Sequence, residues 1–181
     1  MAINCAIKDH EISHAITTKI EHHAVLYPLQ QLEKAGNIKL SYVDVNSDGL
    51  ICLESLEKIL KNSSRSFVSI MHANNEIGTI QDISLIGDIC KKYNAIFHSD
   101  TVQTVGHYPI DLKSLNVDFI AASAHKFHGP KGIGFIYISE KIQINPLLRG
   151  GSQERNMRAG TENVSGIAAL ALSMELAYKN L

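Results

Sequence analysis

The chain has 181 residues, which is enough for one domain with a sizeable hydrophobic core but short for two. It carries 17 basic and 18 acidic side chains, a formal net charge of −1, and no long block of one sign, so its bulk charge attracts neither nucleic acid nor an anionic membrane. Its longest apolar runs are strand-sized, which excludes membrane spans of helical length.

Apolar runs alternate with amphipathic helical patterns along the chain. The runs are rich in β-branched and aromatic residues, and they predict strands over residues 14–20, 39–45, 66–73, 94–100, 117–124 and 132–139. The helical patterns lie at residues 22–35, 53–61, 82–93 and 165–179, and Asp82 has the position and side chain of an N-cap. This rhythm predicts an α/β fold with a mainly parallel sheet covered by helices on both faces. No repeat or linker interrupts it, so we expect one domain over residues 1–181.

Polar side chains gather where three of the predicted strands end. "HANNE" follows the strand that begins at residue 66, "HSD" ends the strand at residue 100, and "SAHK" ends the strand at residue 124. Ligands of parallel sheets bind beyond the carboxyl ends of the strands. The sequence therefore predicts that these three segments line one crevice.

Lys126 follows the last of these strand ends. A lysine desolvated in a crevice becomes nucleophilic toward an aldehyde, and the neighbouring Ser123 and His125 are suited to hold an anionic phosphate. A lone loop lysine is more often an ordinary surface residue. Lys131 is a rival in the same stretch, but "GPKGIG" has the composition of a turn, which favours a structural role for it.

Asp100 stands at the tip of the predicted strand over residues 94–100. A pyridoxal-phosphate (PLP) enzyme needs a carboxylate against the pyridine nitrogen, because the protonated ring is the better electron sink. Gln103, three residues on, is placed to hydrogen-bond the phenolic oxygen of such a ring. Taken alone, Asp100 is as well explained as the cap of a short helical turn.

Two further segments supply candidates for the same ring. Asn75 is placed to reach the phenolic oxygen, while Asn74 and Glu76 have the character of turn-forming residues. His22 lies between a predicted strand and a predicted helix, where a flat imidazole is able to stack on the ring and move protons. Physical reasoning alone leaves His23 open as an alternative.

Together and in this order the segments resemble one family, the cysteine desulfurases of the class V aminotransferase type. The resemblance covers nearly the whole chain, through "ITTKIEHHAVL", "VSIMHANNEIGTIQDI", "HSDTVQTVGHYPIDL", "DFIAASAHKFHGPKGIGFIYI" and "GGSQERNMRAGTENV". It implies a PLP-binding large domain, incomplete at both ends and without the small C-terminal domain. The implied reaction converts L-cysteine to L-alanine and leaves a persulfide for iron–sulfur cluster assembly or another sulfur acceptor.

The resemblance also implies a role for each matching residue. Lys126 holds PLP as a Schiff base, Asp100 pairs with the pyridine nitrogen, and His22 stacks over the ring and takes part in proton transfer. The residues implied to contact the oxygens of the cofactor are Gln103 and Asn75 at the phenolic oxygen, and Ser123, His125 and Thr161 at the phosphate. Thr161 is implied to reach across from the second subunit of a homodimer.

Some parts of the family pattern are not matched. A phosphate-binding loop is expected upstream of "AINCAIKD", and the catalytic cysteine and the arginine for the substrate carboxylate are expected beyond Leu181. The three cysteines present, Cys5, Cys52 and Cys90, all have the apolar surroundings of small buried residues. We therefore expect no desulfurase turnover from these 181 residues, and three widely spaced cysteines favour a reducing compartment. The expected location is the cytoplasm, with an organelle as the alternative.

Two metal sites compete with this interpretation. "DVNSDGLICLES" places Asp44, Asn46, Asp48 and Gly49 as in an EF-hand calcium loop, but Ser55 stands where the bidentate glutamate belongs. A zinc hydrolase would use a ligand set of His98, Asp100, His125 and His128. We predict no metal site, since PLP explains the same residues with fewer assumptions.

Two further alternatives stay within the PLP interpretation. One is a selenocysteine lyase, and the other is a truncated, non-catalytic module for PLP binding or dimerisation.

Overall fold

In the computed structural model, which describes residues 1–181, six strands form one sheet in the order β2-β1-β3-β4-β5-β6. The strands are β1 (His14–Thr17), β2 (Lys39–Tyr42), β3 (Ser66–Ser69), β4 (Ile96–Asp100), β5 (Phe119–Ser123) and β6 (Gly134–Ile138). Neighbours from β2 through β5 pair in parallel, and β6 pairs antiparallel with β5. The predicted α/β fold with a mainly parallel sheet is confirmed.

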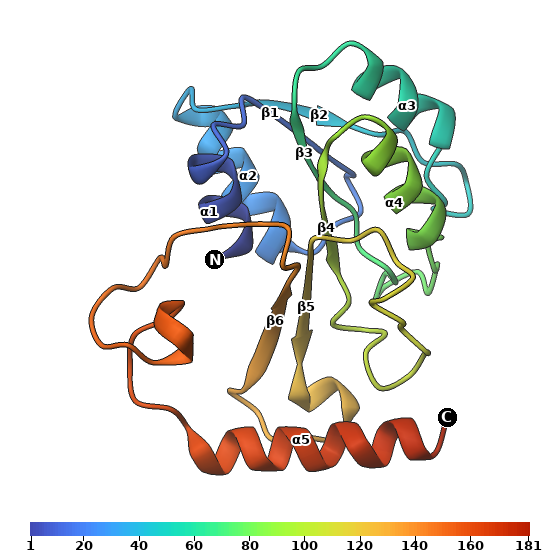
Figure 1. Cartoon of the computed structure of the whole chain (residues 1–181). Coiled ribbons are helices and arrows are strands. Elements are labelled where there is room, and N and C mark those ends of the chain that lie inside the picture. Colours follow the sequence, from blue (N-terminus) through green and yellow to red (C-terminus); the bar gives the residue numbers. More distant parts are fainter.

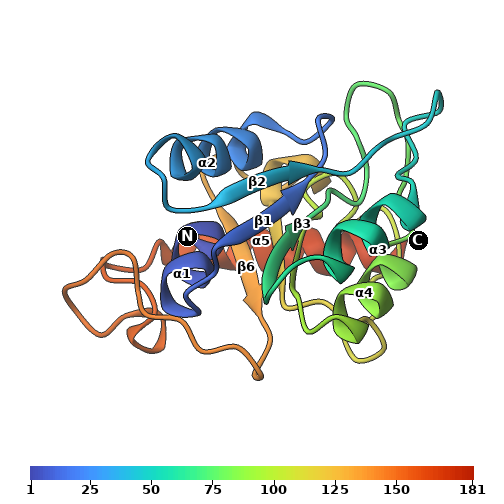
Figure 2. The same cartoon turned by 90° about the horizontal axis from the view of Figure 1, so that it is seen from above.

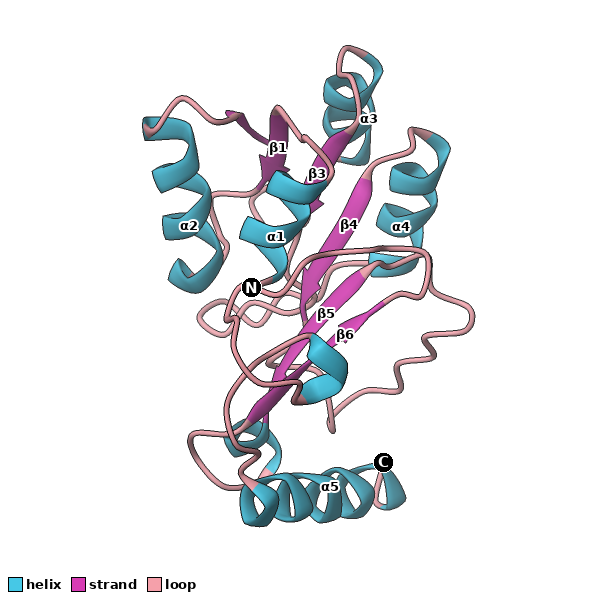
Figure 3. Cartoon of the chain, turned by 60° about the vertical axis from the view of Figure 1, so that its left-hand side comes forward, coloured by secondary structure: helices cyan, strands magenta, loops and turns pink.

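Helices cover both faces of this sheet, as predicted (Figure 1). They are α1 (Ala2–Asp9), α2 (His23–Lys34), α3 (Leu53–Lys61), α4 (Ile83–Lys92) and α5 (Val164–Lys179), with two 3-10 turns, η1 (Ala124–Phe127) and η2 (Glu154–Asn156). Seen from above, α1 and α2 lie on one side of the strands and α3 and α4 on the other (Figure 2). The long helix α5 runs across the end of the sheet at which β5 finishes (Figure 3).

Successive residues of the central strands point into two separate cores. Phe67 and Ile96 pack with α1 and α2, whereas their chain neighbours Val68 and Phe97 pack with α3 and α4. This alternation follows from the pleat of a strand, in which side chains point to opposite faces in turn. Because both faces are covered, β1 and β3 are buried at every position and β4 at every position except Asp100, as expected of central parallel strands.

The predicted elements agree with the structure in kind and differ at their ends. The helix over residues 53–61 and the capping role of Asp82 are confirmed, since Asp82 Oδ1 accepts the backbone N–H groups of Ser84 and Leu85, both at 3.0 Å. The strands are shorter than predicted, because the apolar runs continue past the last sheet pairing into buried loops such as Ile70 and Met71. Helix α1 is an addition to the four predicted helices.

The connections reverse direction at the centre of the sheet. From β1 the chain passes through α2 to the outer strand β2, and from β3 it passes through α4 to β4 on the other side. The loops that leave the carboxyl ends of β1 and β3 therefore diverge. This is a topological switch point, the place where open α/β sheets form a ligand crevice.

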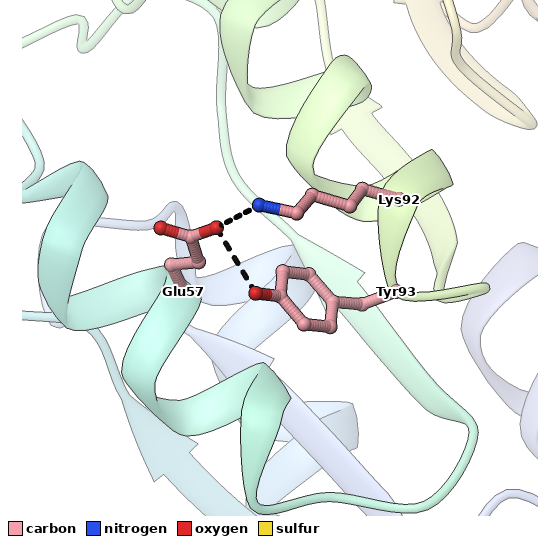
Figure 4. A network of polar contacts seen from close by, with 3 residues as sticks. All are labelled: Glu57, Lys92 and Tyr93. Carbon is pink, nitrogen blue, oxygen red and sulfur yellow. Dashed lines mark hydrogen bonds and ion pairs between the residues drawn. The ribbon is translucent and has the colours of Figure 1, made fainter.

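Helices α3 and α4 are joined at their exposed surface by a small polar network (Figure 4). Glu57 Oε1 accepts from Lys92 Nζ at 2.5 Å and from the Tyr93 hydroxyl at 3.0 Å. This is the single ion pair of the chain, and an exposed pair of this kind contributes little to stability. None of the helices combines the length and the apolar character that crossing a bilayer requires.

We predict different effects for two neighbouring residues of α3. Leu56 is fully buried between α3 and the sheet, so Leu56→Ala should lower the free energy of unfolding by about 2–5 kcal/mol. Glu57→Gln removes the exposed ion pair and should leave the unfolding midpoint nearly unchanged. Urea denaturation followed by circular dichroism measures both, and equal losses in the two variants would contradict this account of the core.

Candidate functional site

Asp100 ends β4 at the carboxyl edge of the sheet and is half-buried. Its Oδ1 atom accepts the backbone N–H of Val102 at 3.0 Å, so the carboxyl caps the turn that follows. Burial raises the pKa of Asp100, while the Val102 bond and the nearby His22 ring act in the opposite direction. The influence of His22 on Asp100 places these two predicted site residues close enough for their charges to interact.

His22 is the N-cap of α2, where its ring Nδ1 accepts the backbone N–H of Ala24 at 3.1 Å. The ring is exposed and lines a cavity of about 350 Å³, formed by the loops after β1 and β3 at the switch point. His23 lines the same cavity, but its ring stacks on Tyr27 with centroids 4.7 Å apart. The structure thus gives the two histidines different neighbours, with His22 the one that acts on Asp100.

Lys126 lies in the 3-10 turn η1, directly after β5. Ala124 and Phe127 of this turn are buried against α5, which leaves His125 and Lys126 between them exposed. The ring N–H of His107 donates to the backbone carbonyl of Lys126 at 2.8 Å and fixes the main chain there. The side chain of Ser123 lies 2.9 Å from Nδ1 of His125, so these two predicted phosphate ligands are already in contact.

The three remaining predicted residues, Gln103, Asn75 and Thr161, lie on three different segments of the chain. Gln103 is half-buried in the turn after β4, and Asn75 is exposed and lines the same cavity as His22. Thr161 is exposed, just before the N-terminus of α5, whereas η1 packs against residues near the other end of that helix, such as Met174 and Ala177. A single chain therefore does not bring Thr161 beside Ser123 and His125.

Glu21 is a buried acid at the switch point that the sequence analysis did not single out. Its Oε1 atom accepts the backbone N–H of Met71 at 2.5 Å, which ties the loop after β1 to the loop after β3. Asn74 adds a second tie, since its Nδ2 donates to the carbonyl of Ile20 at 2.7 Å. The predicted turn-forming role of Asn74 is confirmed, because its Oδ1 also accepts the N–H groups of Glu76 and Ile77. In "KIEHH" the acid resembles any polar loop residue, so the sequence held no signal of its burial.

The rival metal ligands do not converge. His98 is buried, where its ring lies 2.8 Å from the Ser69 hydroxyl and burial lowers its pKa to about 4. His128 ends η1 with a left-handed backbone. In the calcium-like segment, Asn46 Oδ1 accepts the N–H groups of Asp48 and Leu50, which makes the segment a compact turn. The chain holds no group of three or more histidine, cysteine, aspartate or glutamate side chains arranged to bind a metal ion.

A second, larger cavity of about 600 Å³ lies away from these residues. It opens beside the segments that enter β4 and β5 and the segment that leaves β6, so it is at the opposite edge of the sheet. Four cations and two acids line it: Arg65, Lys91, Lys113, Lys141, Asp118 and Glu140. None of the predicted site residues lies there, so size alone does not identify the functional crevice.

The three cysteines differ more than predicted. Cys5 and Cys90 are buried, and burial raises the pKa of both thiols. Cys52 is only half-buried, which corrects the expectation that all three are core residues. It occupies the N-cap position of α3, and its Sγ lies 3.3 Å from a carboxylate oxygen of Glu54.

Comparisons with known proteins agree on one family. Residues 1–181 match the model of the family described as Aminotransferase class-V. The chain is 48% identical over 169 residues to the cysteine desulfurase IscS of Clostridium botulinum, covering 93% of this chain and 42% of that protein. It is 51% identical over 164 residues to the cysteine desulfurase IscS of Dictyoglomus turgidum, covering 91% of this chain and 41% of that protein.

Solved structures give the same result. A NifS-like protein superposes with a TM-score of 0.93 at 45% identity, over 98% of this chain and 49% of that one. The structure of SspA in complex with cysteine superposes with a TM-score of 0.87 at 34% identity, over 94% of this chain and 49% of that one. The chain thus spans less than half the length of these curated relatives and about half of the solved chains.

The burial of the cysteines predicts how they react. In the native chain a thiol reagent such as a maleimide should modify Cys52 rapidly, and Cys5 and Cys90 only after denaturation, because exposure and thiolate formation control the reaction. Peptide mapping by mass spectrometry identifies the modified residue, and Cys52→Ser should abolish the rapid phase. Rapid modification of Cys90 in the native chain would show that α4 does not bury this thiol against the sheet.

Proposed function

The chain belongs to the class-V aminotransferase family, and we propose that residues 1–181 form the PLP-binding large domain of a cysteine desulfurase. The family is PLP-dependent, and when bound the cofactor supplies an electron sink for the reacting carbon. The observation that supports the proposal is the proximity of His22 to Asp100 at the carboxyl edge of the sheet, where η1 follows β5, the strand paired with β4.

The chemistry of these groups fits a phosphorylated pyridine. Lys126 is exposed, and its Nζ is outside the single ion pair of the chain, so its amine is free for an aldehyde. Asp100 is a half-buried carboxyl whose pKa is raised by burial, and a cationic ring nitrogen would favour its ionised form. His22 offers a flat ring held by the cap of α2, and Ser123 and His125 offer two polar groups for a phosphate.

We propose that the contacts to the phenolic oxygen, and the last contact to the phosphate, also follow the family pattern. Gln103 and Asn75 would hydrogen-bond the phenolic oxygen, with Asn75 already at the cavity that His22 lines. Thr161 would complete the phosphate site from the partner subunit of a homodimer, which agrees with its distance along α5 from η1 within one chain.

The proposed substrate is L-cysteine, and the proposed product is sulfur for an iron–sulfur scaffold or another acceptor protein in the cytoplasm. Support comes from the names of the relatives, which are cysteine desulfurases, and from the similar structure that holds cysteine. Cys5 and Cys90 are buried and Cys52 is half-buried at the N-cap position of α3, which supports none of these three thiols as the sulfur acceptor. We therefore propose that residues 1–181 bind the cofactor without turning over cysteine by themselves.

Borohydride reduction in the presence of PLP tests the lysine directly. The wild-type chain should turn yellow and, after reduction, carry the cofactor on the peptide that contains Lys126. Lys126→Ala should lose the adduct, while the exposed control Lys131→Ala should keep it. Asp100→Asn should weaken PLP binding about tenfold or more, since a hydrogen bond to a charged group contributes about 1.5–3 kcal/mol. An adduct on Lys131, or spread over many lysines, would contradict the proposal.

A further inference from the structure

Glu21 is an acidic side chain that is buried, whereas most acidic side chains are exposed to water. It lies on the loop between β1 and α2 and is 5% exposed. Oε1 accepts the backbone N–H of Met71 at 2.5 Å and the hydroxyl of Thr18 at 3.5 Å. Oε2 is buried and has no hydrogen-bond partner. An ionised carboxylate buried with one oxygen unsatisfied is costly, and such groups keep their proton instead.

The charges around Glu21 do not favour its ionised form. Asp100, at the tip of β4, faces it with a like charge. Lys19, His22, His23 and Glu76 line the adjoining cavity, but none forms an ion pair with it. Burial is the largest influence, and together with Asp100 it raises the pKa of Glu21 to about 8.

The position of Glu21 connects three parts of the crevice. It precedes the cap residue His22, it holds the loop after β3 through Met71, and it is close to Asp100. The ends of β1 and β3 are joined just below it, where the Thr17 hydroxyl donates to the Ser69 carbonyl at 2.9 Å. A change in Glu21 would therefore move the His22 loop relative to β3 and β4 without disturbing the sheet.

We propose that Glu21 is a positioning residue, held as a neutral carboxylic acid, which fixes the His22 loop to the loop after β3 and leaves Asp100 as the carboxylate of the crevice. If Glu21 and Asp100 were both ionised, their like charges would repel, which favours a proton on one of them. With the proton on Glu21, Asp100 stays available as an anion. The consequence for a bound pyridine ring rests on the proposed function, whereas the protonation of Glu21 does not.

If Glu21 is neutral in the folded chain, the free energy of unfolding must fall as pH rises. The pKa of Glu21 is about 8 in the folded chain and near its ordinary value, about 4.3, in the unfolded chain. Between these values the folded state binds one more proton, so this residue lowers stability as pH rises through the window and has no further effect above it. Glu21→Gln removes this proton but keeps an oxygen that accepts from Met71.

Unfolding measured against pH tests the neutral state without any cofactor. The folding equilibrium constant of Glu21→Gln, relative to wild type, should rise about tenfold for each pH unit within the window, since one proton separates the two states. Glu76→Gln removes an exposed acid from the same cavity and should follow wild type at every pH. Parallel curves for wild type and Glu21→Gln above about pH 5 would mean that Glu21 is ionised and would overturn the proposal.

The ring of His22 reports the positioning role. In the apo chain its NMR signals should show a step near pH 8 that comes from Glu21 and is absent in Glu21→Gln. Glu21→Ala, which leaves the Met71 N–H without an acceptor, should shift and broaden the same signals and weaken PLP binding, while Glu21→Gln binds as wild type does. If Glu21→Ala does not fold, the test rests on the step near pH 8 in the His22 signals of wild type. The absence of that step would overturn the proposal. Failure of wild type to bind PLP would instead reject the proposed function and leave the pH result standing.

Discussion

The divergence of the loops after β1 and β3 is the constraint on which the candidate site depends. Parallel strands bring their carboxyl ends to one edge, but a crevice forms there only where neighbouring connections run in opposite directions. In this chain the two loops are held across that gap by two side chains, Glu21 to the Met71 N–H and Asn74 to the Ile20 carbonyl. These bonds decide where His22 lies relative to Asp100, so the chemistry of the crevice depends on polar contacts that the sheet itself does not supply.

The sheet contributes rigidity rather than chemistry. Its two cores, one under α1 and α2 and the other under α3 and α4, use alternate residues of the same strands, so most side chains within the central strands are buried and closed to a ligand. The reactive groups are therefore displaced to the strand tips. Asp100 is the last residue of β4, and Lys126 follows β5 in a turn whose neighbours Ala124 and Phe127 are buried against α5. A buried residue on each side of an exposed pair orients the lysine while its amine stays accessible.

The sequence was sufficient for whatever depends on periodicity and local chemistry. Six strands, four helices, the cap at Asp82 and the turn around Lys131 could be predicted from the spacing of apolar, capping and glycine residues. The burial of Glu21 could not, because it arises from a contact with Met71, 50 residues away. The partial exposure of Cys52 was also missed: the predicted helix over residues 53–61 placed this residue at its N-terminus, but its apolar neighbours in sequence suggested a buried side chain. The burial of Glu21 is decided by long-range packing, which no local pattern records.

We propose that the crevice at the switch point, and not the larger basic cavity, receives a phosphorylated pyridine. The two cavities are distinguished by backbone amide shifts in NMR spectra of the isotope-labelled chain titrated with PLP. We expect shifts to concentrate in the loops after β1, β3, β4 and β5, within residues 18–23, 71–76, 100–104 and 123–128. The competing cavity offers a phosphate four cations, Arg65, Lys91, Lys113 and Lys141. Shifts centred on that cavity, with the four loops unchanged, would show that PLP binds at the opposite edge of the sheet.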